Sequence, residues 1–132
     1  MIKQDYLLRM IQEIIALLVQ ALLNKRKIDK NHWAEYDNLT TQLLGLPCND
    51  LSQLDADAII ARYQDNPDKW ELCELAAILL LKMSDEMSNE QLVEKSRAKQ
   101  NGTSLLEYVQ AHSPNFSLQR SQLLQLLKSG QQ

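Results

Sequence analysis

Histidine and cysteine are the side chains in this sequence that could act as a base or a nucleophile near neutral pH. The chain of 132 residues contains two of each: His32, His112, Cys48 and Cys73. Neither histidine shares a short motif with a cysteine or a carboxylate, whereas nucleophilic catalysis requires a base within hydrogen-bonding distance of the nucleophile. The pairs Cys48–His32 and Cys73–His112 stay open as contacts in the folded chain, because the sequence does not give their geometry. We therefore assign no catalytic residue, and the sequence favours a protein without enzymatic activity.

Metal ligands usually occur at short spacings such as His-x-x-x-His or Cys-x-x-Cys, and this sequence has neither. Glu71 and Glu74 would share one helix face, but a di-metal carboxylate site in a helical bundle normally adds Glu-x-x-His pairs, which are missing. A phosphate-binding loop requires clustered glycines. The three glycines, Gly45, Gly102 and Gly130, lie far apart and are predicted to be helix stops. The sequence therefore predicts no metal site and no cofactor.

Four large aromatic side chains are the best candidates for an interaction surface: Trp33, Tyr36, Tyr63 and Trp70. Large aromatic residues at partly exposed helix positions often anchor protein partners. They also hold helices together within a core. Because only 5% of the residues are aromatic, packing inside the protein remains the alternative for each of the four.

The composition indicates that helices must position these residues. Hydrophobic residues make up 45% of the chain, and the chain has only three glycines and three prolines. A β-sandwich or barrel of this length would need many turns and more of both residues. Leu, Gln, Glu, Lys and Ala are abundant and favour helices. The predicted fold class is all-α, with a single domain at 1–128 and a frayed tail at 129–132.

Apolar residues recur every three or four positions along most of the chain, which is the helical period. The predicted helices lie at about 3–27, 31–44, 52–63, 67–83, 89–100, 104–112 and 117–128. Short connections favour antiparallel neighbours. We therefore expect six or seven helices in antiparallel hairpins, as in a tetratricopeptide-like helical bundle. Residues 47–50 are predicted to be a loop, and Asn101–Gly102 a break between two helices.

Polar residues at the expected helix starts are candidates for N-caps, namely Ser52, Asn66, Ser88 and Ser117. Gly45 is expected to end the second helix. In the two most apolar helices the predicted core residues are Leu7, Ile11, Ile14, Leu18, Leu22, Ala76, Leu79, Leu80 and Met83. Leu92 and Val93 are expected to anchor an otherwise polar fifth helix.

Charge is unevenly distributed along the chain, whose formal net charge is −3. Residues 1–30 hold six Lys and Arg against three Asp and Glu, and residues 91–132 hold five against two. The middle, residues 31–90, holds three against twelve. An acidic surface repels phosphate groups, so we expect no nucleic-acid partner.

The most apolar segment, 14–23, is a ten-residue run interrupted only by Gln20, whereas a membrane span needs about 20 residues. Asp5 and Glu13 precede this run, unlike the acid-free start of a signal peptide. We expect a core helix, no membrane association and a cytoplasmic location. Two cysteines are too few for a disulfide framework, which agrees with a reducing compartment.

The opening residues Lys3-Gln4-Asp5-Tyr6-Leu7 resemble the start of a family of small bacterial proteins of unknown function. The later segments 106–109 and 116–120 are similar to the C-terminal pattern of that family. Members of the family resemble tetratricopeptide-like helical folds. The resemblance implies an all-α fold and a bacterial source, and it implies no activity and no site residues.

The expected fold, the missing catalytic motifs and the acidic centre favour a non-catalytic helical module, an interaction or scaffold protein that binds an unknown protein partner. The alternative is a small ligand-binding regulator or an enzyme with a pocket between helices. A deep pocket holding His32 or His112 beside a carboxylate would favour the alternative. A shallow groove between helices would favour the interaction module.

Two almost wholly apolar helices, 3–27 and 67–83, are hard to cover within one small domain, because small domains have much surface for their volume. An uncovered apolar stripe is unusual for a monomer, and pairing about a two-fold axis is the common solution. We therefore expect a homodimer; in the alternative monomer, the remaining helices cover both. Sedimentation equilibrium at micromolar concentrations distinguishes the two, since a single-chain mass throughout would contradict the dimer.

Overall fold

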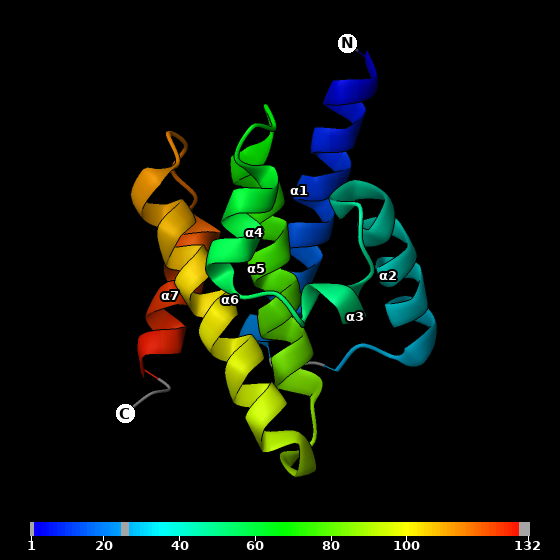
Figure 1. Ribbon diagram of the computed structural model, residues 1–132, viewed down its shortest axis with the longest axis vertical. Helices are drawn as coiled ribbons and strands as arrows, with labels where there is room; N and C mark the ends of the chain where they lie inside the picture. Colours follow the sequence, from blue (N-terminus) through cyan, green and yellow to red (C-terminus); the bar gives the residue numbers. More distant parts are fainter. Residues whose placement is uncertain (1, 25–26, 130–132) are drawn as a thin grey trace.

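The computed structural model describes residues 2–24 and 27–129, and within them the chain forms seven α-helices, one 3-10 turn and no strand. The elements are α1 (Ile2–Leu23), α2 (Lys30–Leu44), α3 (Cys48–Leu51), α4 (Ala56–Tyr63), α5 (Lys69–Glu86), η1 (Asn89–Gln91), α6 (Leu92–His112) and α7 (Leu118–Ser129). The all-α prediction is therefore confirmed. α5, α6 and α7 run antiparallel in succession, whereas the tetratricopeptide-like arrangement stays a prediction (Figure 1).

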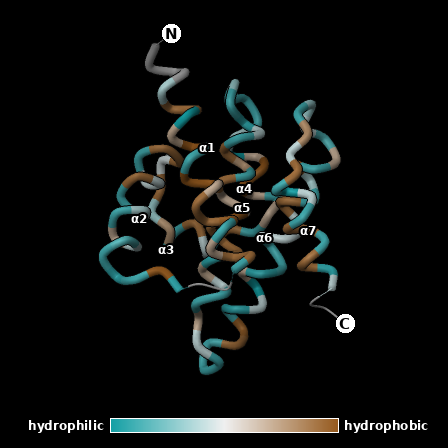
Figure 2. Tube along the Cα trace, turned by 180° about the vertical axis from the view of Figure 1, so that it is seen from behind, coloured by the Kyte–Doolittle hydropathy of each residue, from teal (hydrophilic) through white to brown (hydrophobic). Residues whose placement is uncertain are grey.

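α5 lies at the centre of the bundle, with α1 on one side and α6 on the other (Figure 1). Eleven of its residues are buried, and it also contacts α2, α3 and α4. A helix that is apolar around most of its circumference must be covered in this way. Ala76, Leu79 and Leu80 are fully buried as predicted, and Met83 is half-buried. Hydrophobic segments accordingly concentrate where α1 and α5 meet (Figure 2).

Gly102 brings α6 closer to α5 than a larger residue would allow. A Cβ atom on Gly102 would lie 2.9 Å from Leu81 Cγ and 3.0 Å from the carbonyl oxygen of Ala77. The predicted break at Asn101–Gly102 is therefore wrong, because α6 continues through both residues. Glycine costs a helix about 1 kcal/mol relative to alanine, and here the close packing of two helices offsets that cost.

The loop predicted to follow Gly45 contains the short helix α3, and the next helix begins later than predicted. Ser52 does not cap that helix, because its hydroxyl donates a hydrogen bond back to the Asn49 carbonyl (2.7 Å) at the end of α3. Asp55 caps α4 instead, since its carboxylate accepts a hydrogen bond from the Ala58 amide (2.8 Å). Gly45 ends α2 in the left-handed conformation (φ 84°), as predicted.

The three other predicted N-caps differ in outcome. Asn66 Oδ1 accepts a hydrogen bond from the Asp68 amide (2.8 Å) in the turn just before α5. Ser117 Oγ accepts one from the Arg120 amide (3.2 Å) at the start of α7, as expected of an N-cap. Ser88 stands at the N-cap of η1, but its side chain makes no capping hydrogen bond.

The first turn of α6 packs differently from the prediction. Leu92 and Val93 do not anchor it, because their side chains are 62% and 76% exposed. The buried residues of α6 lie further along: Ala98, Gly102, Leu105, Leu106 and Val109. At the other end of the chain, Ser129 is the last residue of α7, and the rest of the predicted tail lies outside the described residues.

α1 covers one side of α5 but leaves part of its own apolar surface in solvent. Ile11, Ile14 and Leu18 are buried as predicted, and Leu22 is half-buried. Leu7 is 43% exposed, contrary to the prediction, because the first turns of α1 project beyond the neighbouring helices (Figure 1). The segment 6–23 of α1 is, among the described helices, the one long and apolar enough to cross a membrane, and 33% of it is buried.

Replacing Gly102 by Ala should destabilise the protein by about 1–3 kcal/mol, because the added methyl group must displace Leu81 and the Ala77 backbone. Alanine in place of glycine at an unconstrained helix position would instead stabilise the protein by up to about 1 kcal/mol. The sign of the change in unfolding free energy therefore distinguishes close packing at Gly102 from an unconstrained position. Urea unfolding followed by circular dichroism measures it. Ser104→Ala, at an exposed position of α6, is the control and should change the free energy of unfolding by less than about 0.5 kcal/mol. A stabilised Gly102→Ala variant would contradict the close packing.

Candidate functional site

α2 lies at the edge of the bundle, and the Glu86 carboxylate at the end of α5 holds its first turn (Figures 1 and 2). Glu86 Oε1 accepts a hydrogen bond from Trp33 Nε1 (2.5 Å), and Glu86 Oε2 accepts one from the Ile28 amide (2.9 Å). The buried Lys82 ammonium lies 3.3 Å from the same carboxylate and 2.9 Å from the carboxylate of Asp85. One half-buried carboxylate therefore joins α2 and the residues before it to α5.

The rest of α2 is held through contacts with α3 and α4. Tyr63 of α4 is buried, and its hydroxyl donates a hydrogen bond to the Leu44 carbonyl at the end of α2 (2.6 Å). Asp37 Oδ1 accepts a hydrogen bond from the Cys48 amide at the start of α3 (3.1 Å). These contacts fix α2 along one face and leave its two flanks open.

A cleft of about 540 Å³ opens on one flank of α2, between α2, α3 and the end of α5. We call this cleft the Trp33 groove. Its apolar lining consists of Trp33, Ala34, Cys48, Met83 and Met87. Its polar lining consists of Asp37, Asn49, Ser52, Glu86 and Gln91. A concave surface that combines apolar side chains with polar groups is typical of a binding site.

The titratable groups that line the Trp33 groove are the Cys48 thiol and the carboxylates of Asp37 and Glu86. Burial raises the pKa of the Cys48 thiol to about 11, so the sulfur is protonated at neutral pH and is a poor nucleophile. The carboxylates of Asp37 and Glu86 already accept hydrogen bonds from within the protein. Neither His32 nor His112 belongs to the lining of this groove.

The four aromatic residues predicted as an interaction surface do not gather in one place. Trp33 lines the Trp33 groove, and Tyr36 lines a separate groove on the other flank of α2. Tyr63 is buried against the end of α2. Trp70 lies on α5 with its ring centroid 5.7 Å from that of Tyr108, and it lines a third cleft. Two of the four, Trp33 and Tyr36, therefore flank one helix at open grooves.

The sequence analysis did not single out Ala34 and Met87 of the Trp33 groove, and it assigned Met83 to the core. Met83 and Met87 stand one helical turn apart where the apolar run of α5 ends, on either side of Glu86 in the sequence. A pair of methionines at the end of a core helix is a weak signal, because methionine is common within cores. Only the position of α2 over the end of α5 shows that both side chains reach a groove.

The histidines and cysteines lie in separate surroundings. His32 Nδ1 lies 2.8 Å from Asp29 Oδ2 at the exposed start of α2, and hydrogen bonds from the His32 amide and ring lower the pKa of Asp29. His112 packs against Tyr108, with ring centroids 4.7 Å apart. Cys48 Sγ lies 3.6 Å from the Thr40 hydroxyl, and Cys73 is buried in α5 with a pKa raised by burial to about 11. In the part of the chain that the structure describes, neither cysteine–histidine pair forms a hydrogen-bonded couple.

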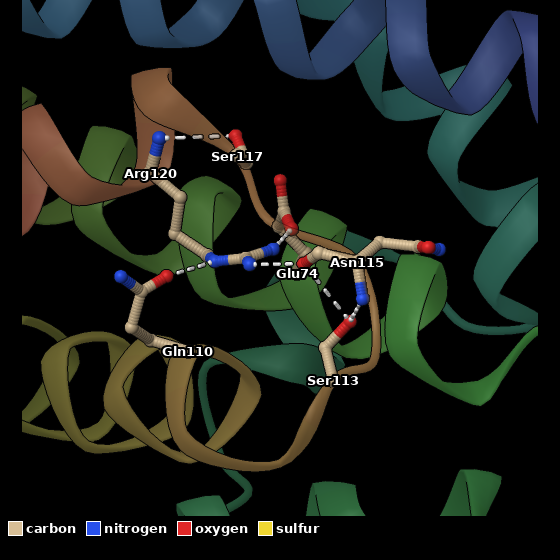
Figure 3. A network of polar contacts seen from close by, with 6 residues as sticks. All are labelled: Glu74, Gln110, Ser113, Asn115, Ser117 and Arg120. Carbon is tan, nitrogen blue, oxygen red and sulfur yellow. Dashed lines mark hydrogen bonds and ion pairs between the residues drawn. The ribbon is translucent and has the colours of Figure 1, made fainter.

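A third cleft, of about 200 Å³, surrounds the Arg120 side chain, which is 4% exposed (Figure 3). Arg120 Nη1 donates a hydrogen bond to Glu74 Oε1 (2.6 Å), and Arg120 Nε donates one to Gln110 Oε1 (2.6 Å). Arg120 Nη2 donates a third to the Asn115 carbonyl (2.7 Å). The guanidinium therefore ties α5, α6 and the turn before α7 together.

The Arg120 cleft does not provide a metal site. Burial raises the pKa of Glu74, and the nearby Arg120 opposes this shift. Glu74, one of the two glutamates with suitable spacing for a metal, is thus paired with Arg120, while Glu71 lines the same cleft. Among the described residues, no group of three or more His, Cys, Asp or Glu side chains could hold a metal ion.

No protein-family model, curated protein or solved structure matches this chain. The resemblance of its opening and late segments to a family of small bacterial proteins therefore stays a prediction. The site is defined by its geometry alone.

Replacing Arg120 by Met should destabilise the protein by about 3–5 kcal/mol at neutral pH, because it leaves the Glu74 carboxylate buried without its cation. The double variant Glu74→Leu/Arg120→Met removes both groups and should recover most of the loss. Urea unfolding of wild type and both variants measures these differences. An equal loss in the single and double variants would show that packing of Arg120, and not its charge, supports the turn.

The stability of the Arg120→Met variant relative to wild type should depend on pH. Burial raises the folded-state pKa of Glu74, and loss of Arg120 raises it further. As pH falls, the folded Arg120→Met variant therefore protonates Glu74 at a higher pH than the unfolded chain does, and this proton uptake stabilises the folded variant. Its stability deficit relative to wild type should therefore shrink as pH falls from neutral towards the unfolded-state value of about 4.3. A deficit that is constant over this range would contradict a buried, unpaired carboxylate.

Proposed function

We propose that this protein is a non-catalytic interaction module that binds a peptide segment of a partner protein in the Trp33 groove. The observation that carries the proposal is an open cleft of about 540 Å³ whose wall combines Trp33 with Met83 and Met87. Tryptophan is enriched among the residues that contribute most to binding energy. Methionine side chains adapt their shape and are frequent at surfaces that accept varied partners.

Trp33 is well prepared for binding because its indole is already oriented. The hydrogen bond from Trp33 Nε1 to Glu86 holds the ring, and the ion pair of Glu86 with the buried Lys82 holds the carboxylate. A ligand that packs on a fixed ring loses less conformational entropy than one that must order it. The side-chain amides of Asn49 and Gln91 also line the groove and can donate and accept hydrogen bonds with a peptide backbone.

The alternative, a small-ligand regulator or an enzyme, has weaker support. The Arg120 cleft has a volume of about 200 Å³, below the roughly 300–1,000 Å³ of ordinary ligand pockets, and its guanidinium is already bonded to three groups. The carboxylate beside His32 belongs to the exposed N-cap Asp29 and not to a deep pocket. These observations argue against a ligand site in the Arg120 cleft and against a catalytic site at His32.

Selection of peptides from a randomised phage-displayed library, with the protein as bait, tests the proposal. Peptides selected on the wild type should lose affinity roughly tenfold or more, about 1.4 kcal/mol, on the Ala34→Arg variant. Ala34 is exposed at the groove, so the arginine fills the binding surface without disturbing the core. The indole N–H signal of Trp33 in a nitrogen-15 NMR spectrum should shift on binding.

The matched control is Ala61→Arg, which adds the same side chain at an exposed position of α4 outside the groove lining. It should bind the selected peptides as the wild type does. Peptides that bind both variants equally, without a shift of the Trp33 signal, would show that the Trp33 groove is not the binding site.

A further inference from the structure

The second open flank of α2 faces α1, and the cleft there has a volume of about 310 Å³. We call it the α1–α2 groove. Its apolar lining comes from Met10, Ile14 and Leu17 of α1 and from Tyr36 and Leu39 of α2. It is separate from the Trp33 groove, because its lining residues on α2 belong to the opposite flank of that helix.

The α1–α2 groove continues the uncovered apolar surface of α1. On a helical projection Tyr6, Met10 and Leu17 fall within about 40° of one another, beside the buried face of α1. Tyr6 is 61% exposed and Leu17 is 55% exposed. The stripe from Tyr6 to Leu17 is roughly 16 Å long, or three helical turns. An apolar stripe of this length beside a second helix has the dimensions of a seat for a third helix.

The charged side chains in this groove are acidic. Glu13 of α1 and Glu35 of α2 line it, and both are exposed. The Arg9 and Lys30 side chains do not belong to the lining, whereas His32 does, and its ring nitrogen Nδ1 lies 2.8 Å from the Asp29 carboxylate. The groove therefore combines an apolar floor with two carboxylates, which attract cations across the water-exposed margin.

We propose that the α1–α2 groove docks a cationic amphipathic helix from a separate partner protein. The apolar face of that helix, with residues at i, i+3 or i+4, and i+7, covers Met10, Leu17 and Tyr36. Lysine or arginine residues beside this face pair with Glu13 and Glu35. The partner helix supplies the cover that α1 lacks within one chain, and it does so independently of the Trp33 groove.

A second copy of this chain fits the groove less well. Two α1 helices that pair antiparallel and bring Met10 of one copy against Leu17 of the other place their two-fold axis beside Glu13. The two Glu13 carboxylates then face each other, and this repulsion between like charges opposes the pairing. A membrane surface rich in anionic lipid is disfavoured for the same reason, since Glu13 and Glu35 would approach negative head groups.

Binding of two synthetic helical peptides to the full chain tests the proposal. Both peptides are about five turns long and carry Leu on one face; one has Lys and the other Glu at all flanking positions. In fluorescence anisotropy at near-physiological salt, the Lys peptide should bind at least roughly tenfold more tightly than the Glu peptide. The Glu13 and Glu35 carboxylates attract the lysines of the first peptide and repel the glutamates of the second. Leu17→Gln, at an exposed position, should weaken binding of the Lys peptide.

The matched charge variants decide where the peptide binds. Glu13→Lys/Glu35→Lys should weaken binding of the Lys peptide roughly tenfold or more. Glu94→Lys/Glu107→Lys makes the same change of net charge at exposed positions of α6 and should leave the affinity almost unchanged. Equal losses in both double variants, or equal binding of the two peptides, would overturn the proposal.

Two further measurements exclude the other occupants. A dimer in sedimentation equilibrium that Leu17→Gln converts to a monomer would show that a second copy covers the groove, and it would overturn the proposal. Cosedimentation with vesicles of phosphatidylcholine and phosphatidylglycerol that Leu17→Gln abolishes would overturn it in favour of a lipid surface. A monomer that does not bind these vesicles supports the partner helix.

Discussion

The burial of most of α5 is the constraint on which the rest of the structure depends. Eleven of its residues are removed from water, and apolar surface is present around most of its circumference, so every neighbouring helix must cover a sector of it. α6 approaches closely because Gly102 has no side chain to hold it away from Ala77 and Leu81. α1 and α4 cover other sectors, which leaves α2 at the edge of the bundle with two open flanks. The grooves are thus a geometric consequence of how one central helix is covered.

Charged groups fix the two ends of this arrangement. Near the start of α5, Glu74 pairs with Arg120 of α7, and at its end Glu86 joins Lys82, Trp33 and the Ile28 amide. Buried ion pairs add little net stability compared with apolar packing, while removing one partner is costly. Their effect here is on geometry, because Arg120 ties α7 to α5, and Glu86, held by Lys82 of the same helix, ties α2 to α5 through Trp33 and the Ile28 amide. Apolar packing alone would tolerate a rotation or a shift of α2 that these hydrogen bonds do not.

The sequence was informative where the signal is local and failed where it depends on tertiary contacts. Helical periodicity and the Gly45 stop predicted most elements and the buried faces of α1 and α5. Gly102 was misread because a glycine that ends a helix and a glycine that allows close packing look alike without a neighbour. Leu92 and Val93 were misread because an apolar pair does not reveal whether another element covers it.

The same limit applies to the candidate site. Trp33 and Tyr36 line the grooves beside α2, Trp70 lines the separate Arg120 cleft, and Tyr63 is buried, and only the packing of the helices decides between these outcomes.

The position of α2 between the two grooves also links the shapes of the two grooves. A single helix forms a wall of both, so any displacement of α2 that narrows one cleft changes the width of the other. The Glu86 carboxylate opposes such a displacement, because it accepts hydrogen bonds from Trp33 and from the Ile28 amide. The same carboxylate that orders the Trp33 indole therefore also holds the helix that both grooves share.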